Sequence, residues 1–147
     1  MNLKIIYEIE NKGIAVLSPS SAWTDTIEKL AIKDIPPNTP YKIVESLNID
    51  NTFFDAYEFN QETGAKVNID KAKEIWLEHY RRARTPLLAS LDVSFMRAVE
   101  SGDTDLQKEI ASKKQALRDV TKTDLPNTLE EIKTTWPEIL GQNPFNK

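Results

Sequence analysis

The amino-acid sequence predicts an α+β protein: a small N-terminal antiparallel sheet with one short helix, followed by a C-terminal helical hairpin or bundle. Two observations support this fold class. Residues 1–60 contain short runs of β-branched and aromatic residues bounded by turn residues, which is typical of strands. In residues 69–140 the apolar residues recur at helical spacing. The polar stretch at residues 61–68 is expected to be a linker, and residues 141–147 are expected to be a flexible tail.

Four short strands and one helix are expected in the N-terminal module. The runs "LKIIYEI" (Leu3–Ile9) and "IAVLSP" (Ile14–Pro19) flank the turn-forming "NKG", which indicates a β-hairpin. The stretch "TDTIEKLAIKDIPP" has a helical apolar stripe and stops at Pro36, so it predicts a short helix. Two further runs, "YKIVESL" (Tyr41–Leu47) and "TFFDAYEF" (Thr52–Phe59), are predicted to be strands.

Three helices and a short fourth are expected in the helical module. The first covers residues 69–84. The second begins with Thr85 as its N-cap and Pro86 in the first helical position, and it ends at a glycine. The third follows almost at once over residues 105–120, so the second and third should form an antiparallel hairpin. The short fourth helix is expected near Leu129–Trp136.

Positive charge gathers in "HYRRARTPLL", which holds three of the five arginines in a chain whose net charge is −4. The predicted hairpin brings Lys114 and Arg118, at the end of the third helix, back beside Arg81, Arg82 and Arg84. Guanidinium groups bind phosphate bidentately, and a helix N-terminus favours anions. The cluster therefore suggests a site for phosphate or pyrophosphate.

A purely structural interpretation of these cations stands beside the ligand site. Glu78 lies four residues before Arg82, Asp119 is adjacent to Arg118, and Asp92 lies on the second helix. Arginines at the end of a helix also suit its negative C-terminal dipole. On this alternative the positive charges pair with local carboxylates and bind no ligand.

Aromatic residues in the N-terminal module offer a second candidate element of a ligand site. Alternation along the predicted strand Thr52–Phe59 separates Phe54 from the face that carries Tyr57 and Asp55. Such rings stack on nucleotide bases, but aromatic residues on one face of a strand also build a core. Trp23 follows Pro19 in a predicted loop, where it either covers a ligand or packs half-buried against the sheet.

Several chemistries are not supported by the sequence. Cysteine is absent, which excludes disulfides and thiolate ligands, and the single histidine, His79, excludes a multi-histidine metal site within one chain. The glycine-rich phosphate-binding motifs and the serine-nucleophile motif are also missing. We therefore expect no enzymatic activity, no metal and no cofactor. A net charge of −4 argues against DNA or RNA polymers as partners.

Neither a membrane span nor a targeting segment is predicted. No run of about 18 apolar residues occurs in the chain. The N-terminal "MNLKIIYEIENKG" carries acidic residues and a strand pattern where a signal peptide would have a basic end and an apolar core. Residence in the cytoplasm is the expectation.

Five stretches of the sequence resemble small proteins encoded by tailed phages and prophages. These stretches are "LKIIYE…GIAVLSP", "TIEKLAIKDIPPNTPYKIVES", "TFFDAYEF", "RRARTPLLASLDVSFMRAVESGD" and "KKQALRDVT". One branch resembles the anti-Thoeris sponge family, which binds cyclic ADP-ribose signals and sequesters them without cleavage. The other branch comprises virion or tail-fibre accessory proteins. Similar phage sequences often carry an arginine after the first phenylalanine and a tryptophan at the position of Tyr57, where this chain has Phe54 and Tyr57.

The resemblance to the sponge family implies a homo-oligomeric protein of the host cytoplasm that binds a small nucleotide-derived signal. The "KKQALRDVT" motif carries Lys114 and Arg118 over as phosphate contacts. The full candidate site comprises five cations and three aromatic residues: Arg118, Lys114, Arg81, Arg82, Arg84, Phe54, Tyr57 and Trp23. The alternative is a phage virion or tail-fibre accessory protein that binds another protein through the helical hairpin.

Overall fold

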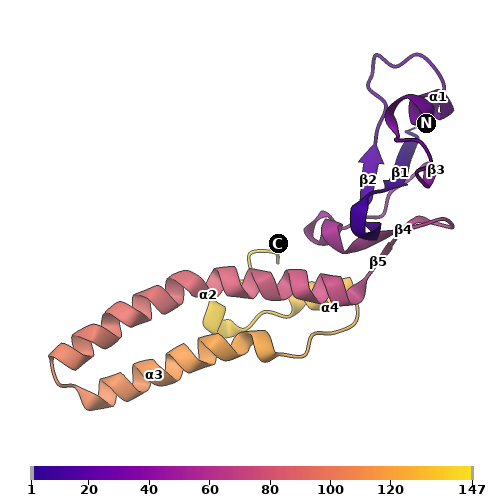
Figure 1. Ribbon diagram of the computed structural model, residues 1–147. Coiled ribbons are helices and arrows are strands. Elements are labelled where there is room, and N and C mark those ends of the chain that lie inside the picture. Colours follow the sequence, from indigo (N-terminus) through magenta and orange to yellow (C-terminus); the bar gives the residue numbers. More distant parts are fainter. Residues whose placement is uncertain (1, 147) are drawn as a thin grey trace. The chain divides into compact units, whose positions relative to one another are not determined.

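The computed structural model describes residues 2–146 and confirms the α+β class (Figure 1). Strands are confined to the first half of the chain, and long helices to the second. The chain divides into two compact units, Met1–Ala72 and Lys73–Lys147, which we call the N-terminal unit and the helical unit.

The N-terminal unit is built on a three-stranded antiparallel sheet in the order β2-β1-β3. Its strands are β1 (Lys4–Glu8), β2 (Ile14–Leu17) and β3 (Tyr41–Val44). The predicted hairpin of β1 and β2 is present, and in its register Ile5 lies opposite Leu17. The turn between these strands is the short 3₁₀ segment η1 (Glu10–Lys12).

Helix α1 (Ile27–Asp34) packs its apolar side against the sheet. Its N-cap is Thr26, whose side-chain oxygen accepts a hydrogen bond from the main-chain N–H of Lys29 at 3.3 Å. Five buried side chains form the core beneath it: Ile5, Ile27, Leu30, Ala31 and Ile35. Burial of each of the larger aliphatic side chains contributes roughly 1.5–3 kcal/mol, so α1 is held mainly by this cluster.

A second hairpin completes the N-terminal unit and corrects two predictions. Residues 52–59 were predicted to be one strand, but the structure forms the 3₁₀ segment η2 (Asn51–Ala56) before strand β4 (Tyr57–Asn60). Phe53 and Ala56 are both buried, a spacing of three that fits a 3₁₀ turn and not a strand. Residues 61–68, predicted to be a linker, contain strand β5 (Gly64–Val67), which pairs with β4.

The long helix α2 (Ile69–Glu100) lies mostly in the helical unit, from Lys73 onward. The sequence predicted two helices here, but the structure forms one. Thr85 is not an N-cap: its hydroxyl donates to the main-chain oxygen of Arg81 at 2.8 Å, one turn back. Pro86 lies inside the helix. Proline removes one helical hydrogen bond, but α2 packs against α3 on both sides of Pro86, and that tertiary packing outweighs the local break.

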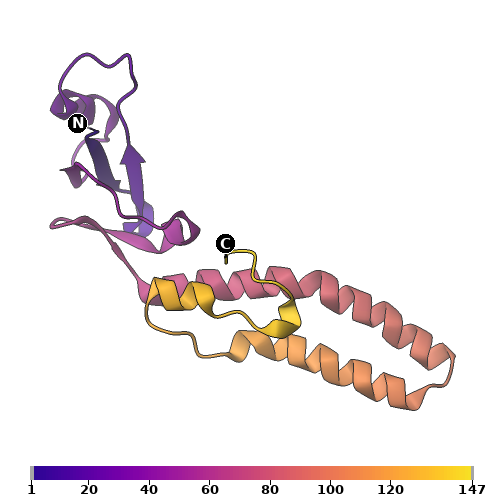
Figure 2. The same ribbon diagram turned by 180° about the vertical axis from the view of Figure 1, so that it is seen from behind.

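Helix α3 (Thr104–Asp119) runs back along α2, as predicted (Figure 1, Figure 2). Asp103 caps it by accepting from the N–H of Leu106 at 3.0 Å. The residues of α2 that meet α3 alternate at spacings of four and three, as in a coiled-coil seam. They are Arg84, Leu91, Phe95 and Ala98, and Leu88 occupies the intervening position of the same stripe.

The C-terminal segments pack as three short helical turns: η3 (Val120–Lys122), α4 (Leu129–Thr134) and η4 (Glu138–Leu140). The main-chain oxygen of Thr135, just after α4, accepts hydrogen bonds from Trp76 Nε1 at 2.8 Å and from the Tyr80 hydroxyl. Both of those aromatic residues are fully buried on α2.

The tail at residues 141–147 was predicted to be flexible, but part of it packs. The Phe145 ring lies with its centroid 4.9 Å from that of Trp76, and it also contacts His79. Aromatic packing on α2 therefore holds this part of the tail, and Lys147 lies outside the described residues. Within residues 2–146, no helix combines the length and the apolar character needed to cross a membrane.

Candidate functional site

The first two arginines of the predicted site pair with carboxylates on their own helix. Arg81 Nη1 lies 2.7 Å from Glu74 Oε1 and 3.2 Å from Glu78 Oε2. These hydrogen bonds raise the pKa of Arg81, and the bond to Glu74 contributes more than the bond to Glu78. Arg82 Nε lies 3.7 Å from Glu78 Oε1. The structure therefore supports the carboxylate-pairing alternative for Arg81 and Arg82.

Arg84 has a different role, because it binds the end of α3. Its Nη1 donates to the main-chain oxygen of Arg118 at 2.9 Å and approaches that of Leu117 at 3.4 Å. The last carbonyls of a helix lack intrahelical partners and carry partial negative charge. The Arg84 guanidinium hydrogen-bonds to these carbonyls, so its positive charge stabilises the packing of α3 against α2.

The two cations on α3 are not equivalent. Lys114 Nζ lies 2.5 Å from Asp92 Oδ1 on α2 and 5.5 Å from the centre of the Phe95 ring, and only 18% of its side chain is exposed. Arg118 is exposed, and its guanidinium forms no ion pair with any residue from 2 to 146. Of the five predicted cations, Arg118 is the one whose charge is available to a ligand.

The helix N-terminus expected beside the arginines does not exist, because α2 continues through Pro86. The hairpin does bring Arg84 and Arg118 together, as predicted. Lys114 lies further along α3, against Asp92. The structure thus assembles two of the five cations and lacks the backbone N–H groups that were expected to add anion affinity.

The three aromatic residues of the predicted site belong to the N-terminal unit. Tyr57 is buried, and its hydroxyl accepts from the main-chain N–H of Asp50 at 3.0 Å, so it is a core residue. Phe54 lines a cavity of about 230 Å³ together with Tyr57 and Lys71. Trp23 Nε1 donates to the main-chain oxygen of Thr26 at 3.0 Å. Lys33 Nζ lies over the Trp23 ring at 5.4 Å.

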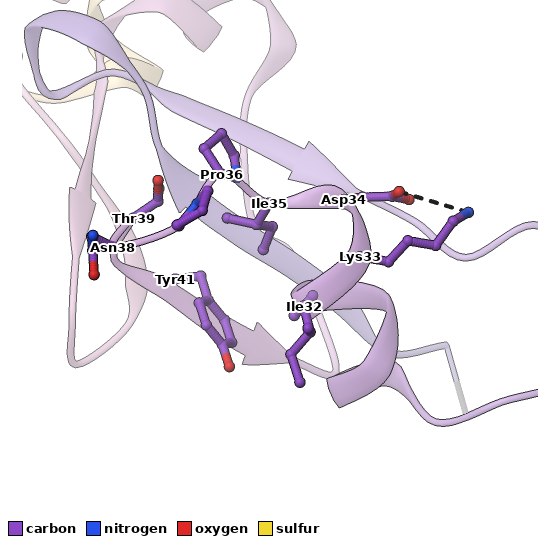
Figure 3. Close-up of a pocket in the computed structure, with 10 residues that line it drawn as sticks. Ile32, Lys33, Asp34, Ile35, Pro36, Asn38, Thr39 and Tyr41 are labelled. Carbon is purple, nitrogen blue, oxygen red and sulfur yellow. Dashed lines mark ion pairs between the residues drawn. The ribbon is translucent and has the colours of Figure 1, made fainter.

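A larger cavity of the N-terminal unit, about 590 Å³, lies where α1 turns into β3 (Figure 3). Ile32, with 80% of its surface exposed, and Tyr41 stand beside it. The charged residues at its rim, Lys33 and Asp34, pair with each other at 3.7 Å. Its described lining offers apolar surface, and the one cation in it is already paired, so the cavity does not suit a phosphate group.

The helical unit holds an apolar groove of about 360 Å³ between α2, α3 and η4. We call it the hairpin groove, and it is lined by Leu87, Ser90, Leu91, Lys113, Leu117 and Ile139. Leu87 and Ile139 are 36% and 39% exposed. Among the described residues that line it, Lys113 is the one charged residue, and it pairs with Glu109 at 3.2 Å. Its chemistry suits aliphatic side chains.

Sequence reasoning missed the hairpin groove, although one signal was present. Leu87 and Leu88 are adjacent, and adjacent residues lie roughly 100° apart around a helix. Both leucines therefore cannot face α3, and one of them has to be exposed or covered by another segment. The other wall of the groove, Ile139, comes from η4, and nothing in the local sequence pattern indicates where η4 packs.

His79 lies in the aromatic cluster and not in an acid–base arrangement. Its ring centroid is 4.5 Å from that of Phe145 and 5.7 Å from that of Trp76. Burial, with a smaller contribution from the charge of Arg82, lowers the pKa of His79 below its ordinary 6.5. Residues 2–146 contain no group of three or more His, Cys, Asp or Glu side chains placed to hold a metal ion.

Comparison with protein-family models, with curated proteins and with solved structures found no match to this chain. The hairpin groove is suited to apolar contact, and Arg118 is an exposed cation of the predicted site that has no ion pair within residues 2–146.

Proposed function

We propose that the chain is a non-enzymatic binding protein that acts by docking on another protein through the hairpin groove. This corresponds to a phage virion or tail-fibre accessory protein, one of the two roles that the sequence resemblance implies. The observation that carries the proposal is the groove itself: an open apolar surface framed by Leu87, Leu91 and Ile139 on the helical unit.

The chemistry of the groove indicates what kind of partner segment it takes. Leucine and isoleucine side chains line it, so the partner presents one or two aliphatic side chains, as an amphipathic helix does when it binds in a groove. Each aliphatic side chain that becomes fully buried contributes roughly 1.5–3 kcal/mol before the cost of association is subtracted. Lys113 at the rim favours an acidic residue beside the apolar ones.

The experiment compares the proteins retained by the immobilised chain and by groove variants in extracts of the cells that naturally produce it. Leu87→Lys and Ile139→Lys place a charge in the groove at positions that are already partly exposed, so the helical unit should still fold. The matched control is Ile32→Lys, an exposed apolar residue of the N-terminal unit.

Support for the proposal is a protein retained by the wild type and by Ile32→Lys but lost, by tenfold or more, with both groove variants. Tenfold corresponds to about 1.4 kcal/mol of binding free energy. A retained protein that is unaffected by both groove variants would show that the groove is not the docking site.

A second function is favoured by a different observation: the guanidinium of Arg118 is exposed and forms no ion pair with any residue from 2 to 146. On this proposal the chain captures a cyclic ADP-ribose-class signal without cleaving it, as proteins of the anti-Thoeris sponge family do. Arg118 would contact the pyrophosphate, because guanidinium groups bind phosphate oxygens in pairs. Lys114 would contribute only by leaving Asp92.

The test of the second function is the melting temperature of the pure chain with and without cyclic ADP-ribose, followed by heat release and identification of the ligand. Stabilisation of the wild type, loss of that stabilisation in Arg118→Ala and recovery of intact ligand support it. Arg82→Ala is the matched control, since the side chain of Arg82 is highly exposed. An unchanged melting temperature rules this ligand out.

A further inference from the structure

Helix α2 carries a second apolar stripe on the side that faces away from α3. Its members are Pro86, Ala89, Val93 and Met96, at successive spacings of three, four and three. We call these four residues the outer stripe. Val93 lies two residues from both Leu91 and Phe95, which places it roughly 200° around the helix from the residues that meet α3.

The outer stripe is exposed within the helical unit. Val93 and Met96 are 52% and 58% exposed, and Pro86 and Ala89 are also exposed. Along the part of α2 that leads to the hairpin turn, α3 is the neighbouring helix (Figure 1, Figure 2). By helical spacing, the residues of α2 that meet α3 lie on the other side of α2 from the outer stripe. Spacings of three and four residues are those of the positions that contact a partner helix in a coiled coil.

The charges beside the outer stripe indicate the partner. Asp92 directly precedes Val93, and Arg97 directly follows Met96. In a parallel two-stranded coiled coil, a residue at the first of these positions on one helix faces the residue five positions later on the partner helix. A second copy of α2, aligned in parallel, therefore places its Arg97 opposite Asp92, and the two-fold symmetry repeats the pair on the other side.

Both charged groups are available for this contact. Arg97 is exposed and forms no ion pair with any residue from 2 to 146. Asp92 receives Lys114 on one carboxylate oxygen, Oδ1, and its side chain is 60% exposed. Lys114 thus holds the Asp92 side chain in place and leaves Oδ2 for a second cation.

We propose that a second copy of this chain binds the outer stripe, so that two α2 helices pair in parallel through Val93 and Met96 with reciprocal Asp92–Arg97 ion pairs. The next positions at the same spacing are the charged residues Arg82 and Glu100, so the apolar contact spans only Pro86–Met96, about 16 Å. An interface of this size falls in the small, transient class, and the dimer forms only at high protein concentration. The proposal goes beyond the proposed function and uses a different side of α2 from the hairpin groove.

The first test is sedimentation of the full chain from low micromolar to near-millimolar concentration. The wild type should shift from monomer to dimer as its concentration rises. Asp92→Arg and Arg97→Asp each place like charges opposite each other in the parallel pair, so each variant alone should remain monomeric. An equimolar mixture of the two restores both ion pairs and should dimerise as the wild type does.

The mixture separates this interface from a loss of folding. Asp92→Arg also removes the partner of Lys114, so it can destabilise the hairpin, but Arg97→Asp breaks no ion pair among residues 2–146. A wild type that stays monomeric throughout overturns the proposal. A dimer that both charge reversals leave intact, or a mixture that stays monomeric, overturns it equally.

The second test uses the absence of cysteine, because a single introduced thiol reports one position. In a parallel pair the two copies of residue 93 meet across the axis, so Val93→Cys should form a disulfide between copies under mild oxidation. Ser112→Cys, on the exposed surface of α3, is the control and should not. Equal cross-linking of both variants would contradict the assigned register.

Discussion

The guanidinium of Arg84 lies 2.9 Å from the main-chain oxygen of Arg118 and thereby joins α2 to the end of α3. The two arginines are adjacent, as the sequence predicted, but one of them binds the backbone of the other. Positive charge beside a helix C-terminus stabilises that terminus. The contact gives Arg84 a structural role that needs no ligand, and it leaves the Arg118 guanidinium exposed, with no ion pair in the described part of the chain.

Arg84→Ala should lower the free energy of unfolding of the helical unit by about 1.5–3 kcal/mol, the usual contribution of a hydrogen bond that involves a charged group. Arg82→Ala, two residues earlier on α2, is the matched control. It should change the free energy of unfolding by less than about 0.5 kcal/mol, because the Arg82–Glu78 pair is highly exposed. Urea unfolding followed by circular dichroism measures both. Equal effects would mean that the Arg84 contact to α3 does not stabilise the hairpin.

Pro86→Ala should stabilise the helical unit by up to about 3 kcal/mol, because it restores the backbone donor that proline removes from a helix interior. Thr85→Ala should have only a small effect, since the Thr85 hydroxyl donates to Arg81 and caps nothing. Thermal unfolding of both variants distinguishes one helix from two. A break at this point would instead make Thr85→Ala cost about 1 kcal/mol, as the loss of an N-cap does.

Gly64→Ala should destabilise the N-terminal unit by more than the conformational penalty alone. Gly64 has a φ of 90°, and a Cβ at this position would lie 2.7 Å from Ile6 Cδ1. Gly102→Ala is the matched control, because Gly102 also has a positive φ, 70°, but no atom within 4 Å of the added carbon. Its cost should be about 1–2 kcal/mol.

The comparison of these two glycine variants is made by urea unfolding at one temperature. A loss at Gly64 clearly larger than the loss at Gly102 confirms that β5 packs closely on the sheet. If Gly64→Ala costs no more than the control, the β4-β5 hairpin does not lie against Ile6.

The stability of the helical unit should fall as the pH drops through the range in which His79 titrates. Its pKa is lowered in the folded protein, first by burial and then by Arg82. The unfolded chain therefore binds a proton on His79 more readily than the folded protein does. The neutral ring contributes its full stability above pH 6.5, the ordinary pKa of histidine. That stability is lost as the pH falls through the lower pKa of His79 in the folded protein. His79→Gln should flatten this part of the profile.

Unfolding free energies measured at closely spaced pH values between neutral and mildly acidic test this expectation. Glu58 and Asp119 have lowered pKa values, the former chiefly through Lys71 and the latter through Lys122, so both titrate at more acidic pH. An identical slope in wild type and His79→Gln would assign the pH dependence to other groups.

The sequence predicted the α+β class and the hairpin because both depend on local periodicity. Apolar spacing placed Leu91 and Phe95 correctly toward α3, and turn residues placed the β1-β2 hairpin. The predicted helix break at Thr85–Pro86 was wrong, because the rule for proline is local and packing along α3 overrides it. The linker prediction failed for a similar reason: the polar residues before Gly64 form a hairpin turn.

The candidate site was less predictable than the fold. Sequence spacing alone does not decide whether a lysine meets a phosphate or a carboxylate on another helix, and Lys114 meets Asp92. The aromatic residues depend on tertiary packing in the same way, since Tyr57 is buried by its own unit. The hairpin groove requires η4, whose position follows from packing that no local pattern encodes.

Site-specific photo-cross-linking from position 87 shows whether the chain docks on another protein through the hairpin groove. A photoreactive phenylalanine derivative replaces Leu87 in one sample and Arg82, on an exposed side of α2, in the control, both in the cells that naturally produce the chain. Docking through the groove should give one defined cross-linked protein from position 87, abolished by the additional change Ile139→Lys, and little from position 82. No cross-link from position 87, or the same product from both positions, would contradict it.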